Sequence, residues 1–501
     1  MAYPITRRRD IAPLLGPVLH FRGTGGGDWH ASALYVLERG DEPPPALTVD
    51  GGPPAARPRH LARHRDRDFW IYDFSVPQDA GETRVGYGLA GGERHYVAVP
   101  GLSEPPRFAF ASCNGAEDEG AFAQPGFRNA RWAHLFGRHR TRPYHLLLHG
   151  GDQLYADAVW TDCPSLVAWR SLPARDRLTA PFTPSMAEQV EDFYVGLYLR
   201  LWRQPEIAAL LASVPSVMMW DDHDIFDGWG SHPEDRLDSP VFRGVYGVAR
   251  QCFSLFQVAM DPAVPAESCW GAGIGTFTQG FRMGGVGLLA LDLRSERRPD
   301  RILSERSWSE LPRWLDRLSG VRHLLLMSGV PLAFVNLNAV ERLANALPGQ
   351  MRLEDDLRDQ WRSYAHEGEW LRLLRLLGDH AVRRRVRVTV LSGEVHLGYS
   401  AVIRGPGHQI WQLTSSGIAH PAPSRVYVEI LERLARGVET IRDGLTIEMV
   451  PLPGSGRHFI RMRNWLEILF RDDGALAAQW HVEGETDRLV RIVPPPPRPE
   501  G

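Results

Sequence analysis

Three apolar runs in this chain of 501 residues each end in a cluster of oxygen-rich side chains. They are HLLLHGGDQLYAD (145–157), MMWDDHD (218–224) and VTVLSGEVH (388–396). Apolar runs of about four to eight residues bounded by turn residues are typical of buried strands. In open α/β sheets, ligands bind in the crevice outside the carboxyl ends of such strands. The pattern predicts an α/β fold with a functional site at strand ends.

From Arg107 onwards, strand-like runs alternate with helical ones. Helical periodicity is clearest in 190–202, and we also expect helices at 371–377 and 426–436. Strands alternating with helices indicate layered α/β architecture. The strand candidates are FAFAS (108–112), HLLLH (145–149), SVMMW (216–220), VGLLALD (286–292), HLLLMSG (323–329), VTVLSG (388–393) and IWQLTSS (410–416).

The residues before Arg107 have a different pattern. FWIYDFSV (69–76) and RHYVAV (94–99) alternate as strands do, and no helical period is visible between residues 14 and 100. We therefore expect a small antiparallel β-sandwich there. The predicted division is an N-terminal sandwich-like domain (1–104), a catalytic domain (105–425), a C-terminal helix and strands completing it (426–490) and a Pro-rich tail (491–501).

Composition excludes several classes of protein. The chain contains no lysine, so its 57 basic residues are all arginine. Phosphate-loop NTPases and Schiff-base enzymes need a lysine and are excluded. A net charge of −3 argues against a dedicated nucleic-acid surface. No apolar stretch is long enough to span a membrane.

The N-terminus carries a weak export signal. Arg7, Arg8 and Arg9 precede an apolar run, as in twin-arginine signals, but Pro13 and Pro17 interrupt that run. We therefore expect a cytoplasmic protein.

The glycine pair in GGDQLYAD permits a tight turn after its strand. Asp152 would then project where a carboxylate can bridge two cations, with Tyr155 within one turn of it. A helix-capping aspartate is the alternative. In WDDHD, Asp221, Asp222 and Asp224 repel one another unless a cation lies among them. The alternative there is a solvated acidic loop.

Five further residues are candidates. His223 could ligate a metal or protonate a leaving group. Glu394 and His396 lie two apart, so an extended backbone places them on one side, and the alternative is a helix or turn cap. Cys113 also ends a strand, although a lone cysteine is more often a small buried hydrophobe. Arg294, after VGLLALD, could hold a phosphoryl oxygen, or lie on a solvated loop.

Together these clusters resemble the calcineurin-like metallophosphoesterase superfamily, specifically its PhoD-like (alkaline phosphatase D) branch. GGD (150–152) is similar to the first motif and DDHD (221–224) to the second, with Asp222 in place of the usual asparagine. SGEVH (392–396) is similar to the last motif, with Glu394 where the branch has aspartate. ASCN (111–114) resembles the branch's cysteine motif.

The resemblance implies a two-sheet β core flanked by helices and a centre of ferric iron with calcium, with other divalent metals as the alternative. Its iron ligands would be Cys113, Asp152, Tyr155, Glu394 and His396. Asp152 would bridge to calcium, held by Asp222 and more weakly by Asp221. This division suits the metals, since thiolate, phenolate and imidazole favour transition metals and clustered carboxylates favour calcium.

The implied activity is hydrolysis of small phosphate monoesters or diesters by a metal-activated hydroxide, with His223 acting on the leaving oxygen. Arg294 would hold a phosphoryl oxygen. The alternative is a non-catalytic binding protein on a degenerate phosphoesterase scaffold.

Overall fold

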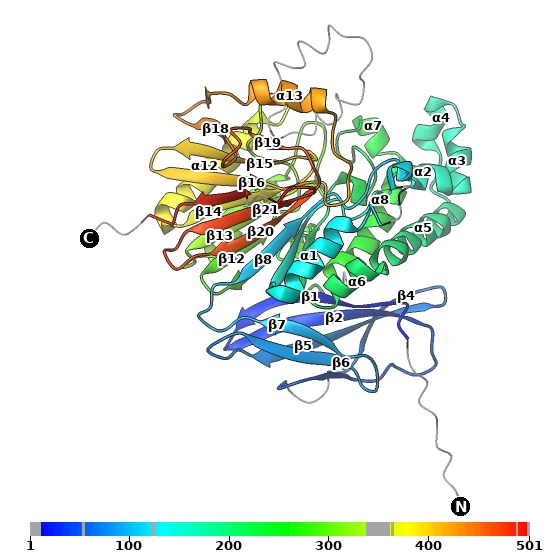
Figure 1. Ribbon diagram of the computed structural model, residues 1–501. Helices are drawn as coiled ribbons and strands as arrows, with labels where there is room; N and C mark the ends of the chain where they lie inside the picture. Colours follow the sequence, from blue (N-terminus) through cyan, green and yellow to red (C-terminus); the bar gives the residue numbers. More distant parts are fainter. Residues whose placement is uncertain are drawn as a thin grey trace, which may run out of the picture.

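The computed structural model describes residues 12–52, 56–122, 124, 126–261, 263–336, 361, 365–486 and 489–497. Two large β-sheets at its centre are flanked by helices (Figure 1). The predicted two-sheet α/β core is therefore confirmed.

The first sheet has ten strands. In spatial order they are β22 (Leu489–Val493), β21 (Leu476–Val482), β20 (Asn464–Phe470), β8 (Arg107–Ala111), β9 (Leu146–Gly150), β10 (Ser216–Met219), β1 (Leu15–Gly25), β2 (Asp28–Glu38), β5 (Arg67–Pro77) and β4 (Arg59–His64). Strands β8, β9, β10 and β1 run parallel to one another. Their carboxyl ends therefore lie at one edge.

The second sheet has nine strands. They are β11 (Gln279–Met283), β12 (Val286–Ala290), β13 (His323–Ser328), β14 (Arg387–Ser392), β16 (His408–Thr414), β15 (Gly398–Gly405), β18 (Thr446–Val450) and β17 (Val438–Thr440), with β19 (Phe459–Ile460) beside β15. Strands β12, β13, β14 and β16 are parallel. All seven predicted strands are thus present, as β8, β9, β10, β12, β13, β14 and β16.

The two sheets share a core. Phe110 and Leu148 of the first sheet belong to the same buried apolar cluster as Met327 and Leu391 of the second. Every residue of β8, β9, β12 and β13 is buried, as expected for parallel strands covered on both faces. The packing fixes the two sets of strand ends relative to each other.

Helices cover the outer faces of both sheets. The principal helices on the first sheet are α1 (Ala130–Thr141), α5 (Pro184–Trp202), α6 (Pro205–Leu211) and α8 (Pro240–Phe253). Those on the second are α9 (Glu305–Arg317), α12 (Glu367–Arg384) and α13 (Arg425–Leu434). Four short helices lie in the segment between β9 and α8. They are α2 (Val159–Asp162), α3 (Pro164–Arg170), α4 (Ala174–Thr179) and α7 (Glu234–Leu237).

The helix predicted at 190–202 is the carboxyl part of α5. Thr183 caps this helix, its hydroxyl accepting a hydrogen bond of 3.2 Å from the Met186 amide, and Pro184 occupies the first turn, where its missing N–H costs nothing. The run at 371–377 lies in α12, and the helix predicted at 426–436 is α13.

The described residues between 12 and 104 contain strands and no helix, as predicted. A separate three-stranded sheet comprises β3 (Leu47–Val49), β6 (Thr83–Leu89) and β7 (His95–Val99). The remaining N-terminal strands extend the first sheet, because β1 pairs with β10 at His20 and Ser216. Hydrogen bonding thus crosses the boundary placed at residue 104, and the division into domains stays a prediction.

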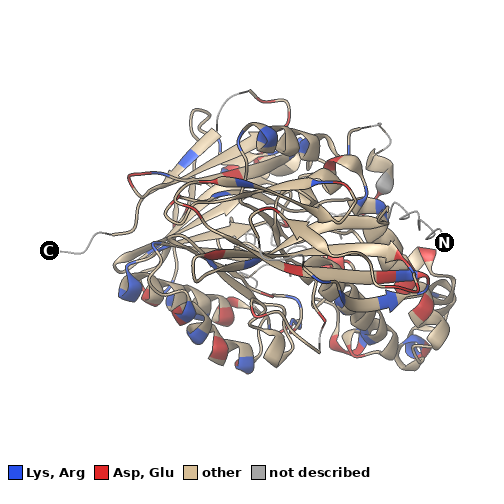
Figure 2. Ribbon diagram, turned by 90° about the horizontal axis from the view of Figure 1, so that it is seen from below, with Lys and Arg blue, Asp and Glu red and all other residues tan. Residues whose placement is uncertain are grey.

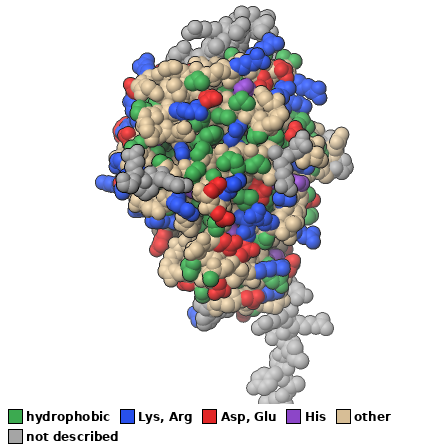
Figure 3. Space-filling model, turned by 60° about the vertical axis from the view of Figure 1, so that its left-hand side comes forward, with side chains coloured by type: hydrophobic (Ala, Val, Ile, Leu, Met, Phe, Trp, Pro, Cys, Tyr) green, Lys and Arg blue, Asp and Glu red, His purple; other side chains and the backbone are tan. Residues whose placement is uncertain are grey.

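Charged residues of both signs lie mainly on the outer helices and loops, whereas the central strands are mostly uncharged (Figure 2). On the face shown in Figure 3, acidic and basic side chains are interspersed. Within the described ranges, no helix is long and apolar enough to cross a membrane. Arg7, Arg8, Arg9 and the last four residues of the predicted tail lie outside the described residues, and β22 extends into that tail as far as Val493.

Candidate metal centre

Three carboxylates meet where two neighbouring strands end. Asp152 follows β9, and Asp221 and Asp222 follow β10, its parallel neighbour. One oxygen from each lies within 4.8 Å of the others. Burial, and next the charge of Asp221, raise the pKa of Asp152 well above its ordinary value. A cation among these oxygens would remove the cost of burying their charges together.

The backbone turns sharply at four of the predicted ligands. The φ angle is 54° at Asp152, 55° at Cys113, 63° at Glu394 and 52° at His396. Left-handed conformations are uncommon for residues other than glycine and gather at functional sites. Each of these residues lies in the loop that follows β8, β9 or β14, so the strained turns lie at one edge of the paired sheets.

Cys113 lies beside Asp152 and is buried. Its Sγ is 3.4 Å from Asp152 Oδ2 and 3.0 Å from Ser416 Oγ. The Glu394 carbonyl oxygen is 3.9 Å away, so the β8, β9, β14 and β16 ends converge on the thiol. Burial, and next Asp152, raise the pKa of the thiol well above its ordinary value.

Tyr155 closes the same region. Its hydroxyl is buried and has no hydrogen-bond partner among the described residues. Burial raises the pKa of this phenol well above its ordinary value, and Cys113 adds to the effect. A Cβ at position 115 would lie 2.3 Å from the Tyr155 ring, so only glycine allows the chain to pass this close.

His223 is held between the tyrosine and a carboxylate. Its ring stacks on Tyr155 with centroids 4.3 Å apart, and its Nδ1 is 2.9 Å from Asp157 Oδ2. Burial alone would lower the pKa of His223, but Asp157 and Asp222 outweigh burial and raise it well above the ordinary value. Asp157 therefore orients the imidazole, and the neighbouring carboxylates favour its protonated form.

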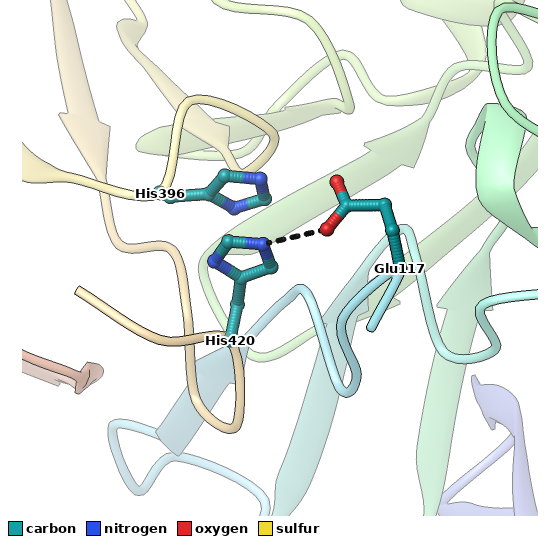
Figure 4. A group of neighbouring side chains, drawn as sticks. All are labelled: Glu117, His396 and His420. Atoms are coloured by element: carbon teal, nitrogen blue, oxygen red, sulfur yellow. Dashed lines mark ion pairs between the residues drawn. The ribbon is translucent and has the colours of Figure 1, made fainter. Parts of the chain in front are cut away.

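His396 belongs to a second group with Glu117 and His420 (Figure 4). The two imidazole rings are stacked with centroids 3.4 Å apart, and His420 Nε2 is 3.5 Å from Glu117 Oε2. One ligand atom from each of the three residues lies within 4.8 Å of the others. The hydrogen bond from His420 lowers the pKa of Glu117 well below its ordinary value.

The sequence analysis identified His396 but missed Glu117 and His420. His420 follows the IWQLTSS strand, so the rule that placed the other ligands at strand ends also covers it. Glu117 lies four residues beyond Cys113 in the loop after β8. Neither residue belongs to a motif that the chain displays locally.

Arg294 is buried against two carboxylates, so the alternative of an arginine on a solvated loop is wrong. The Arg294 guanidinium is fully buried and binds Asp221 through Nε and Asp222 Oδ1 through Nη2 at 3.3 Å. The guanidinium is therefore held by Asp221 and Asp222, which we call the acidic pair. This contact offsets the charge of the two carboxylates, and the predicted contact of Arg294 with a phosphoryl oxygen stays a prediction.

The Glu394 carboxylate is absent from the three candidate metal groups found among the described residues, although its main chain adjoins Cys113. Its role as an iron ligand stays a prediction.

Asp224 does not join the other aspartates, contrary to the interpretation of DDHD as three converging charges. The 3-10 turn Asp222–Asp224 rotates its carboxylate away, where it accepts hydrogen bonds from the amides of Asp221 (2.9 Å) and Leu154 (3.1 Å) and from Gln257 Nε2 (2.8 Å). Burial raises the pKa of Asp224 to about 7. Through these hydrogen bonds, Asp224 links the loop after β9 to the loop after β10.

A paired-sheet core with carboxylates, imidazoles and a thiol at its strand ends defines a metallophosphoesterase-type protein. The comparison with known families is specific. The model of the PhoD-related phosphatase family matches residues 107–350 and 347–439, and the chain belongs to that family.

Relatives and solved structures agree with this membership. The uncharacterized protein YGR266W of Saccharomyces cerevisiae is 26% identical over 554 aligned residues, covering 88% of this chain and 78% of the yeast protein. The structure of PhoD matches with a TM-score of 0.58 at 13% identity, over 96% of this chain and 89% of PhoD. Purple acid phosphatase PPD1 from yellow lupin (Lupinus luteus) matches with a TM-score of 0.52 at 12% identity, over 97% and 74% of the two chains. These structural matches establish the shared fold.

Proposed function

We propose that this protein hydrolyses phosphate esters at a centre of ferric iron and calcium. The observation that carries the proposal is the buried triad of Asp152, Asp221 and Asp222, whose oxygens lie within 4.8 Å of one another. Arg294 offsets part of the charge of this triad, and burying the rest is costly without a further cation. Membership of a phosphatase family supports the reaction type.

The donor atoms fit this assignment. Asp152 Oδ1, the Tyr155 hydroxyl and His396 Nδ1 are buried and have no hydrogen-bond partner within the described part of the chain. A thiol, a phenol and an imidazole are donors that a transition metal favours, so Cys113, Tyr155 and His396 would serve iron, with Glu394.

Calcium prefers carboxylates, so Asp221 and Asp222 would hold it, with Asp152 between the two ions. When bound, the metals supply positive charge and activate water for attack on phosphorus.

The chain's own groups complete the reaction. His223, oriented by Asp157, donates its proton to the departing ester oxygen. Arg294 keeps Asp221 and Asp222 in place and balances their charge. Because the chain has no lysine, positive charge for a phosphoryl group can come only from protonated histidines, from arginines and from the metals.

Elemental analysis of the purified protein, together with hydrolysis of p-nitrophenyl phosphate and bis-p-nitrophenyl phosphate, tests the proposal. We expect iron and calcium in the wild type and activity on at least one of the two esters. Asp152→Asn should lose metal and at least a factor of about 10³ in kcat, since it removes the bridging charge.

Asp316→Asn is the matched control, because Asp316 lies on the exposed side of α9 and pairs with Arg384. It should retain metal and activity. An Asp152→Asn protein with full activity and unchanged metal content would refute the proposed centre.

A further inference from the structure

A cavity of about 600 Å³ lies beside the metal centre, between the short helices α2, α3, α4 and α7 and the start of α8. These helices lie together at the right of Figure 1. Asp157 and Asp227 line the cavity at the side of the centre. Asp157 also binds His223 Nδ1, and the Asp227 amide donates to Asp157 Oδ1 at 2.7 Å. The cavity thus adjoins the imidazole that we assign to the leaving oxygen.

One wall of the cavity is aromatic. Trp160, which is partly exposed, packs against Trp169 at 5.7 Å, Phe226 at 4.9 Å and Phe242 at 5.1 Å between ring centroids. The other three rings are buried, so they hold the Trp160 ring in position. A fixed, partly exposed indole provides a surface on which a planar ring can stack.

The cavity is also lined by positively charged side chains, which are arginines. Arg170, Arg175, Arg177 and Arg236 line the same cavity. Among the described residues, neither Arg175 nor Arg236 has a carboxylate within ion-pair distance, unlike many of the surface arginines of this chain. The guanidinium of Arg177 lies 6.0 Å from the Trp169 ring centroid. Guanidinium groups without protein partners beside an aromatic wall can bind an anionic group.

We infer that this cavity binds one ester arm of the substrate, and that the arm is a nucleotide. A nucleotide combines a planar ring for Trp160 with further phosphate charge for Arg175 and Arg236, and its hydroxyl and amino groups can donate to Asp235 or Asp227 at the rim. The inference rests on the proposed phosphoesterase activity and narrows its substrates to nucleotide-containing phosphodiesters.

Calorimetric binding to the metal-loaded full-length protein tests the ligand class without turnover. The probes are ADP, pyrophosphate, which lacks the ring, and adenosine, which lacks the charge. We expect ADP to bind at least about 10-fold more tightly than either. Pyrophosphate binding as tightly as ADP would overturn the inference, because the metal centre alone would then account for affinity.

Two sets of variants locate the site. Trp160→Ala should weaken the binding of ADP about 10-fold relative to the binding of pyrophosphate. The double change Arg175→Gln with Arg236→Gln should weaken the binding of ADP about 10-fold relative to the binding of adenosine. The arginines are exposed, so these changes do not threaten folding. Arg313→Gln, on the exposed side of α9, is the matched control and should leave ADP affinity unchanged. Unaltered ADP affinity in both sets of variants would refute the site.

Inhibition kinetics test whether the cavity belongs to the substrate site. ADP should inhibit hydrolysis of bis-p-nitrophenyl phosphate competitively, and non-competitive inhibition would show that the cavity is not a substrate site. A protein that holds metal but hydrolyses neither ester fails the proposed function, whereas the calorimetric series still decides which ligand the cavity takes.

Discussion

Arg294→Gln should strongly destabilise the metal-free protein. The Arg294 side chain is 0% exposed and contacts Asp221, which is 1% exposed, and Asp222, which is 11% exposed. Removing the guanidinium leaves two buried carboxylates beside Asp152 without their cation. Breaking a buried ion pair by removing one partner costs about 3–5 kcal/mol. We expect a loss within this range, which is a large part of the roughly 5–15 kcal/mol that stabilises most folded proteins.

The measurement is urea unfolding followed by tryptophan fluorescence in the presence of a chelator. Arg313→Gln is the control, since the Arg313 side chain is 75% exposed and its pair with Glu310 should contribute less than about 1 kcal/mol.

Combining Arg294→Gln with Asp221→Asn should cost less than the sum of the single changes, because the second substitution removes one of the uncompensated charges. Adding metal at about 100 times its Kd should restore about 2.7 kcal/mol if the variant still binds it. A loss no larger than that of the control, or strictly additive single changes, would refute the argument that Arg294 serves as the counter-charge of the acidic pair.

Three further outcomes test other parts of the structure. Hydrogen bonds, chiefly from His481, outweigh the effect of burial and lower the pKa of Glu467, so its stabilisation is complete above about pH 4.5 and is lost as the pH falls through the lower folded-state pKa. Unfolding of wild type and Glu467→Gln should therefore differ more at pH 7 than at pH 3, and a constant difference would contradict this. Gly329→Ala places a Cβ 2.5 Å from Asp221 Oδ2, so metal titration should show affinity about 10- to 100-fold weaker, and unchanged affinity would show that the carboxylate can move freely. Thr183→Ala should cost about 1 kcal/mol of unfolding free energy through loss of the α5 cap, and no change would mean that the cap contributes nothing.

Local chemistry determined much of this protein. Strand-length apolar runs predicted the seven central strands, because a strand buried on both faces is mostly apolar, and three of these runs end in the polar clusters that predicted the site. The same rule placed Asp152, Asp221 and Asp222 at one edge, since β9 and β10 are parallel neighbours with matching carboxyl ends.

Only the tertiary structure decided which strand ends meet and which charges pair. Ser112 donates a hydrogen bond to the Ser415 carbonyl across 303 residues of sequence, and such contacts leave no local pattern. The same holds for Glu117 beside His420, for Arg294 bound to the acidic pair instead of solvent, and for the cavity beside His223. Periodicity records only whether a residue is buried, whereas its partner across the core depends on how the two sheets pack.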